Sequence, residues 1–483
     1  RLVGSEMCIR DRIPLMYVNG FRGQVYSTSA TAQLCEIMLR DSAHIQMFEA
    51  EWRNRKAARS GGKLKEFVPL YDMDAAVNVC KQFVGCEYDR VYDIAEGIKI
   101  RFTDVGHLLG SASIEVWATE KTENGDVTEK IVFSGDIGNI NKPIIKDPKH
   151  VRDADYVVME STYGNRSHGG TPNYVEDLTD IFKRTFERGG NVVIPSFAVG
   201  RTQELLYIIR KIKEDNLVGR DFDVYMDSPL AIEATNIFIK NVESCFDDEA
   251  VELVRKGINP LSFPGLKYAT TGDESKQINF DPNPKVIISS SGMCEAGRIR
   301  HHLKHNLWRP ECTIVFVGYQ AVGTTGRIIV DGAEEIKLFG EPIQIKAEIV
   351  QLKGSSGHAD KDGLLCWINA FDTKPKKVFV VHGEDSVCDE FTECLKEEYG
   401  YDAMAPYTGG SYDLIADRVI SEGVKERKTR RTTSTQRGKT VFDRLVAAGK
   451  RLMTVITHNE GGTNKDLAKF TDQINALCDK WDR

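Results

Sequence analysis

Short β-branched runs that end near a histidine or a carboxylate recur along this chain. Ile98 to Thr103 leads into His107, and Lys130 to Ser134 leads into Asp136. The same pattern recurs at Tyr156 to Met159 with Glu160, and at Lys377 to Val381 with His382. Such runs predict buried strands, whose end loops hold side chains accessible on a rigid scaffold. One such residue alone is usually a turn former or a hydrogen-bonded loop residue, but their recurrence indicates metal binding or proton transfer.

His358 adds a further candidate to this set. It lies in a Gly/Ser-rich loop, KGSSGHAD, just ahead of an apolar run from Gly363 to Phe371 that we expect to be helical. A histidine at the start of a regular element suits the same two chemistries as the strand-end residues.

The first part of the chain mixes short strands and helices. We expect a strand at Gln24 to Ser27, followed by a helix at Ala30 to Ser42 and another at Asp74 to Gln82. Apolar and polar residues alternate in two runs, Ile114 to Ala118 and Lys130 to Ser134, and a polar loop, Glu120 to Thr128, lies between them. This pattern predicts a hairpin.

The middle of the chain alternates helices and strands more regularly. Val175 to Phe186 has apolar residues at helical spacing, and a strand at Val192 to Pro195 precedes a turn and a helix at Arg201 to Lys213. The segment PKVIISSSGMCEAGRIRHHL repeats this form, and Thr313 to Gly318 is another expected strand. The alternation predicts an α/β fold with a mostly parallel sheet and ligand-binding loops at its carboxyl edge.

Composition narrows the functional classes. The 483 residues are 41% hydrophobic and 28% charged, without an apolar run of the roughly 20 residues that span a bilayer. The 11 cysteines form no C-x-x-C pair, which argues against a zinc ribbon or a disulfide framework and favours reduced thiols and a cytoplasmic location. A net charge of −7 disfavours indiscriminate binding of polyanions, so any nucleic-acid binding must depend on a confined part of the surface. We expect no membrane partner.

The motifs DVGHLLGSAS, FSGDIGN, ESTYGNRSH, SSGHAD and VVHGE occur in this order. Together they resemble the β-CASP branch of metallo-β-lactamase-fold nucleases, and in particular bacterial proteins similar to the nuclease subunit of the pre-mRNA 3′-end cleavage complex. The resemblance extends from Ile13 to about Asp417. It implies an αββα sandwich with an inserted α/β β-CASP cap domain, and a zinc-dependent ribonuclease that acts on single-stranded RNA.

The resemblance also implies roles for the candidate residues. His107 and His382 would each ligate one of two zinc ions, and Asp136 would bridge them. Glu160 would orient His358, which would protonate the leaving oxygen during phosphodiester hydrolysis.

The family's main ligand cluster, H-x-H-x-D-H, is absent from the chain. We interpret Arg1 to Asp11 as a sequencing or assembly artefact, and expect the native N-terminal segment with four further ligands to be missing. On that interpretation the chain as given would be inactive.

The cap offers candidate substrate contacts at the ends of its strands. Small residues there let backbone N–H groups approach phosphate, and basic side chains add charge-assisted hydrogen bonds. The candidates are Ser196, Arg201, Ser290, Arg298 and His302. An ordinary basic helix start explains the stretch from Arg298 to Lys304 equally well.

We expect four parts along the chain. Residues 1–11 are the artefact, 12–170 and 353–420 form the metallo-β-lactamase domain, 171–352 form the cap, and 421–483 hold a basic linker and C-terminal helices. The basic stretch Lys425 to Lys439 is a solvated linker or an RNA-contacting arm. Phe442 to Ile456 is an amphipathic helix, and Leu467 to Trp481 carries an apolar stripe that packs onto the body or, alternatively, forms a homodimer.

Three other functions remain open from the sequence. They are a DNA-directed β-CASP nuclease, another metallo-β-lactamase-fold hydrolase, and a non-catalytic RNA-binding scaffold. A histidine at position 382, which resembles RNA-directed members of the family, favours RNA.

Overall fold

The structure is a computed structural model. It describes residues 6–59, 67–123, 125–169, 173–352, 356–425, 452–453, 455–457 and 464–481. Two units are distinguished, residues 1–423 and residues 424–483.

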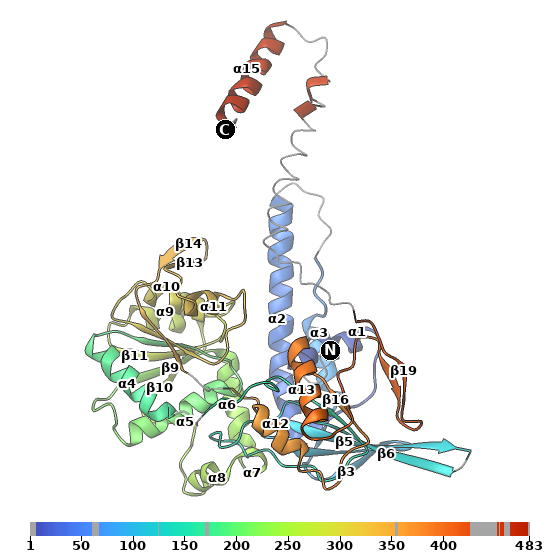
Figure 1. Cartoon of the computed structure of the whole chain (residues 1–483). Helices are drawn as coiled ribbons and strands as arrows, with labels where there is room; N and C mark the ends of the chain where they lie inside the picture. The colour runs from blue at the N-terminus through green and yellow to red at the C-terminus, as the bar shows by residue number, and fades with distance from the viewer. Residues whose placement is uncertain are drawn as a thin grey trace. The chain divides into compact units, whose positions relative to one another are not determined.

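The first unit contains a seven-stranded mixed sheet (Figure 1). Its central strands form a long antiparallel hairpin and then a parallel block, because β6 pairs antiparallel with β5 but parallel with β7. In spatial order the strands are β17 (Ala403–Met404), β16 (Lys377–Val380), β7 (Tyr156–Met159), β6 (Gly125–Phe133), β5 (Ala112–Thr122), β4 (Ile98–Asp104) and β3 (Val91–Ala95).

The β5–β6 hairpin is longer than the sequence predicts. Pairing runs from Ile114 opposite Phe133 to Thr122 opposite Gly125, so most of the expected polar loop is strand. Its distal residues are mostly exposed. Polar residues there face water on both sides of the ribbon, which hides the alternation that marks a half-buried strand.

Helices α12 (Lys361–Ile368) and α13 (Asp385–Glu397) pack on this sheet. Trp367 of α12 and Phe391 of α13 share a buried cluster with Val157 and Val378 of the central strands. This core holds β6, β7 and β16 in place, and these are the strands whose carboxyl ends carry three of the candidate residues.

A second sheet corresponds to the predicted cap. All of its strand pairs are parallel, as the βα alternation predicts. The order is β10 (Leu266–Tyr268), β9 (Asp223–Asp227), β11 (Lys285–Ser289), β8 (Val192–Pro195), β12 (Thr313–Val317) and β15 (Glu348–Leu352).

Both faces of the cap sheet are covered, which explains why its strands are continuously apolar. Ile194 of β8 faces one hydrophobic cluster and its neighbour Val193 faces another. The first cluster includes residues of α4 (Tyr174–Glu187), α5 (Arg201–Glu214) and α6 (Pro229–Lys240), and the second includes residues of α9 (Gly272–Phe280), α10 (Ile299–Asn306) and α11 (Thr325–Val330).

Helix α2 (Ser29–Arg59) joins the two parts of this unit. Ala30, Leu34 and Ile37 are buried in the first cap cluster, together with Ile237 of α6. The helix continues 17 residues beyond the predicted end at Ser42 (Figure 1).

The remaining elements are short. A helix α1 (Glu6–Val18) begins inside the segment that the sequence analysis excludes, so residues 6–11 are helical. The others are β1 (Val25–Thr28), α3 (Met73–Cys80), β2 (Phe83–Cys86), α7 (Val242–Cys245), α8 (Asp248–Arg255), β13 (Glu335–Leu338), β14 (Glu341–Gln344), β18 (Ser411–Asp413) and β19 (Arg418–Ser421).

The second unit contains helix α15 (Asn464–Trp481), in agreement with the predicted C-terminal helix. Residues 426–439 of the basic stretch, and most of the helix predicted at Phe442 to Ile456, lie outside the described residues. None of the helices described for either unit has the length and hydropathy of a membrane span.

Candidate active site

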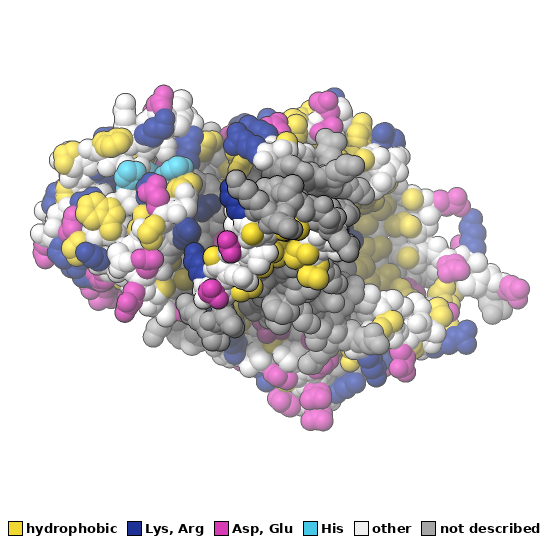
Figure 2. Space-filling view, turned by 90° about the horizontal axis from the view of Figure 1, so that it is seen from above, with side chains coloured by type: hydrophobic (Ala, Val, Ile, Leu, Met, Phe, Trp, Pro, Cys, Tyr) yellow, Lys and Arg dark blue, Asp and Glu magenta, His cyan; other side chains and the backbone are white. Residues whose placement is uncertain are grey.

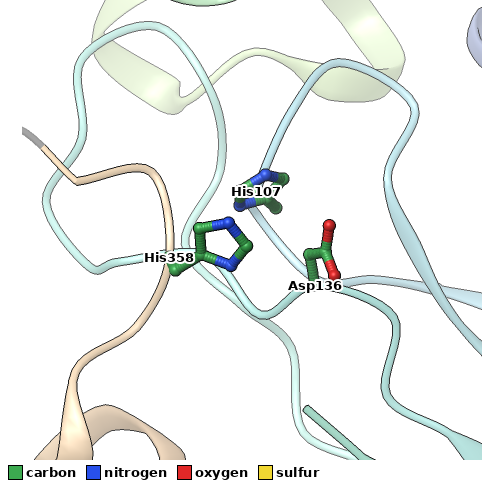
Figure 3. Close-up of side chains that lie close together, drawn as sticks. All are labelled: His107, Asp136 and His358. Atoms are coloured by element: carbon green, nitrogen blue, oxygen red, sulfur yellow. The ribbon is translucent and has the colours of Figure 1, made fainter. Parts of the chain in front are cut away.

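Three of the predicted residues lie together at one edge of the seven-stranded sheet. His107 follows β4, Asp136 follows β6, and His358 precedes α12. One nitrogen of each histidine and one oxygen of Asp136 all lie within 4.8 Å of one another (Figure 3). Imidazole nitrogens and a carboxylate oxygen are the ligands that zinc prefers in catalytic sites, so these residues fit a metal.

His382, which follows β16, lies beside Asp136. Its Nε2 lies 3.3 Å from Oδ1 of Asp136. The edge of a tetrahedron with zinc–ligand bonds of about 2.0–2.2 Å is roughly 3.4 Å, so both atoms can bind one cation. The Nδ1 of His382 is buried and has no hydrogen-bond partner among the described residues. Its backbone has a positive φ of 52°, which is uncommon for a residue with a side chain and marks a constrained position.

Glu160 is paired with His358. Its carboxylate oxygens lie 3.1 and 3.2 Å from Nδ1 of the imidazole, and the Glu160 side chain is only 1% exposed. The backbone N–H of Ile137 also donates to Glu160, at 2.5 Å. Burial alone would lower the pKa of His358, but the hydrogen bond and the charge of Glu160, with a contribution from Asp136, raise it above its ordinary value.

His107 is held in one orientation by the backbone. Its Nδ1 lies 3.1 Å from the carbonyl oxygen of Gly357, to which it donates, and this leaves Nε2 as the acceptor. Burial, followed by the neighbouring charges of His358 and Lys142, places the pKa of His107 well below its ordinary value. A neutral imidazole is the form that binds metal.

Lys142 connects this loop to the cap. Its Nζ donates to the carbonyl oxygen of His107 at 2.8 Å and lies 3.3 Å from Glu204 of α5. Glu204 also forms an ion pair with Arg201, at 2.6 Å. All three side chains are largely buried, so the cap and the His107 loop share one charged network.

The cap residues predicted to bind substrate have different environments. Ser196 is buried, and the hydroxyl of Ser290 lies 2.7 Å from that of Ser228. Arg201 is engaged by Glu204 and lines a pocket of about 680 Å³. The metal-site histidines do not line this pocket, which extends beside the site between α5 and α12.

Arg298 and His302 are turned into the cap. Arg298 forms an ion pair with Asp227 at 2.7 Å, and His302 Nε2 lies 2.6 Å from the other oxygen of the same carboxylate. His302 has no exposed surface. The Arg298 side chain keeps 23% of its surface exposed, and both side chains contact Asp227.

Three residues of these networks were not predicted from the sequence. Asp227 is the last residue of β9, and the strand-end pattern applied to the run Asp223 to Asp227 would have found it. Lys142 and Glu204 are 62 positions apart, and no local pattern links them.

Comparison with known proteins agrees with the geometry. Residues 202–329 match the Beta-Casp domain, and residues 342–406 match the Zn-dependent metallo-hydrolase RNA specificity domain. Ribonuclease TTHA0252 of Thermus thermophilus is 33% identical over 374 residues, which cover 77% of this chain and 78% of the relative.

Two archaeal relatives are also similar. Transcription termination factor FttA of Methanosarcina mazei is 31% identical over 81% of this chain and 59% of the relative. An RNase J-like protein of Methanocaldococcus jannaschii is 35% identical over 60% of this chain and 65% of the relative. The chain therefore spans less than two thirds of each of these two proteins. With the strand-end site and the parallel cap sheet, these similarities show that the chain belongs to the β-CASP family of metallo-β-lactamase-fold ribonucleases.

Proposed function

We propose that this protein hydrolyses phosphodiester bonds of single-stranded RNA with the help of two zinc ions. The observation that carries the proposal is the cluster of His107, Asp136 and His358, whose ligand atoms lie within 4.8 Å of one another. His382 lies 3.3 Å from Asp136, and Glu160 is paired with His358. Family membership and the match to an RNA specificity domain support RNA as the substrate.

In this proposal His107, Asp136 and His382 hold the metal. Bound zinc supplies a Lewis acid for the phosphate and brings the pKa of water towards neutrality. The hydrogen bond from His107 Nδ1 to Gly357 keeps Nε2 free to coordinate, and the short distance between His382 and Asp136 lets both act on one ion.

His358 has the role of a general acid. Its Nδ1 proton is held by Glu160, which leaves Nε2 to carry the proton donated to the departing oxygen. A histidine that donates to a carboxylate is also a common metal ligand, which is the alternative role for His358. Zinc content separates the two roles, because a general acid can be removed without loss of metal.

The proposed setting is the cytoplasm. The support is the cysteine pattern of the sequence, which contains no C-x-x-C pair and favours reduced thiols.

The test is cleavage of a labelled single-stranded RNA, with the same sequence as DNA for comparison, after dialysis against zinc or against a chelator. It compares the chain as given with a version that carries the native N-terminal segment expected from the sequence. We expect zinc-dependent cleavage of RNA by the extended version, lost in Asp136→Asn, and no cleavage by the chain as given. Cleavage that persists in the chelator, or cleavage of DNA in preference to RNA, would contradict the proposal.

A further inference from the structure

The cap exposes two aromatic side chains at corresponding positions. Phe197 lies two residues beyond the end of β8, and Tyr319 lies two residues beyond the end of β12. These strands are parallel neighbours, so both residues lie at the carboxyl edge of the sheet, on strands about 5 Å apart. Phe197 is 44% exposed and Tyr319 is 52% exposed.

The backbone beneath these rings is held firmly. The carbonyl oxygen of Phe197 accepts a 2.7 Å hydrogen bond from Thr202. A Cβ atom placed on Gly292 would lie 3.0 Å from two carbons of the Phe197 ring, so the ring rests against a bare stretch of backbone. Gln320, next to Tyr319, is buried and donates to the carbonyl oxygen of Gly292 at 3.1 Å. One turn therefore supports both aromatic residues.

This edge borders the candidate active site. A Cβ atom placed on Gly200, three residues beyond Phe197, would lie 2.5 Å from a methyl carbon of Leu108, the neighbour of His107. Lys142 joins the same loops through His107 and Glu204. An RNA chain with one phosphate at His107 would therefore pass close to Phe197.

Charge alone does not explain how this edge of the cap sheet would bind single-stranded RNA. The chain carries a net charge of −7, and the nearby Arg201 and Arg298 are engaged by Glu204 and Asp227. On the cap face seen in Figure 2, acidic and basic side chains are interspersed. Bases of single-stranded nucleic acid stack on exposed aromatic rings whatever their sequence, so stacking supplies affinity where charge is balanced.

We propose that Phe197 and Tyr319 form a stacking platform for bases of single-stranded RNA beside the scissile phosphate. The inference rests on the proposed function, because it names how the same site holds its substrate. It predicts binding that depends on bases being present but tolerates changes in their identity.

The experiment compares an RNA of about a dozen nucleotides with the same RNA carrying abasic positions at its centre. Equilibrium binding is measured by fluorescence anisotropy, with and without Asp136→Asn, so that cleavage is separated from binding. Phe197→Ala and Tyr319→Ala should each weaken binding of the intact RNA by about 5- to 100-fold. Their affinity for the abasic RNA should change little.

Matched variants keep the result interpretable. Phe197→Trp and Tyr319→Phe keep a ring and should keep most of the affinity. Phe280→Ala is the control, because Phe280 is 76% exposed and ends α9 just before β11, at the opposite edge of the sheet. The dependence of binding on salt should be the same in all variants, since no phosphate contact is removed.

Three outcomes would overturn the inference, and they separate a failure of the platform from a failure of the proposed function. If the protein binds and cleaves RNA but the alanine variants bind intact and abasic RNA as the wild type does, the platform is wrong and the function stands. Equal losses on both RNAs would have the same meaning. If the wild type neither binds nor cleaves RNA, the proposed function fails, and the platform fails with it.

Discussion

Glu160 lies within 3.2 Å of His358 through both of its carboxylate oxygens, although 198 positions separate the two residues in sequence. The pair joins the end of β7 to the loop before α12. Because Glu160 is buried, its charge acts on the imidazole with little screening by solvent. The proposed acid is therefore oriented by the fold itself, before any substrate binds.

The first prediction concerns His358→Ala. Removal of a general acid should lower turnover by about 10²- to 10⁴-fold and leave zinc content unchanged. Metal analysis and RNA cleavage, measured on the same preparation, check both parts. His44→Ala, at an exposed position on α2, should change neither. Depleted zinc in His358→Ala would make His358 a ligand.

The second prediction concerns the close approach of the two ligand loops. A Cβ atom on Gly138 would lie 2.0 Å from the carbonyl oxygen of Gly106 and 2.6 Å from the amide nitrogen of His107. Gly138→Ala should therefore push the Asp136 and His107 loops apart. We expect a loss of about 1–3 kcal/mol in the free energy of unfolding and roughly 10²-fold in cleavage.

The control for this variant is Gly272→Ala at the start of α9. A Cβ atom there would meet nothing within 4 Å. Its stability should stay within about 0.5 kcal/mol of the wild type, as is usual for a surface substitution. Equal melting temperatures and activities for the two glycine variants would show that the loops can separate without consequence.

The third prediction concerns Lys142→Met. This change removes the group that joins His107 to the buried Glu204, which keeps its ion pair with Arg201. The free energy of unfolding should fall by about 1–3 kcal/mol, since a hydrogen-bonded charge is lost from a buried network. Chemical denaturation measures it. Lys121→Met, which breaks an exposed pair with Glu96, should cost less than about 1 kcal/mol.

The fourth prediction is a pH dependence of stability at Asp104. Burial raises its pKa to about 6, against the hydrogen bond from Gly106 and the charges of Lys146 and Lys149. A carboxyl group whose pKa is raised on folding favours the folded state at low pH, and this contribution is lost as the pH rises from about 4 to 6. At pH 7 the ionised, buried Asp104 therefore destabilises the fold.

Asp104→Asn should thus increase the free energy of unfolding at pH 7 by about 1–3 kcal/mol and have little effect near pH 4. The amide oxygen can still accept from Gly106. Urea denaturation at both pH values tests this, with the exposed Asp126→Asn as the control. A variant that is less stable than the wild type at pH 7 would contradict the sign.

The fifth prediction concerns salt. RNA binding should weaken as salt rises, because phosphates of the strand release counterions when basic groups approach. The sequence places several such groups between Lys425 and Lys439. Titration of a labelled RNA at several salt concentrations measures the slope. A flat response would indicate a small-molecule substrate instead.

Much of the candidate site can be predicted from the sequence because the ends of buried strands can be predicted. Runs such as Tyr156 to Met159 are short, β-branched and bounded by polar residues, and their ends lie at one edge of a sheet. The cap sheet was predictable for the same reason. Local patterns therefore place Asp136 and His382 near each other without any knowledge of their contacts.

The direction in which a side chain points, and its contacts with residues far away in the sequence, are harder to predict. The helix start at Arg298 to His302 predicts either basic groups that face a ligand or an ordinary basic helix start, and in the structure both side chains contact Asp227. A sequence shows that a residue is charged, but it does not show that a buried carboxylate 71 positions away will neutralise it. The length of α2 was underestimated because its second half exposes Phe48 and Trp52, which weakens the one-sided pattern of a core-facing helix.

Ala30, Leu34 and Ile37 of α2 share a hydrophobic core with the cap helices. In the sequence, most strands of the first sheet lie between α2 and these cap helices. The cap and the domain that carries the proposed metal ligands are thus thermodynamically coupled. We expect the first unit to lose its structure in a single cooperative transition, and an excised cap to expose apolar surface where α2 had been. A movement of the cap away from α2 would expose part of this surface to water, so the burial of these residues opposes such a movement.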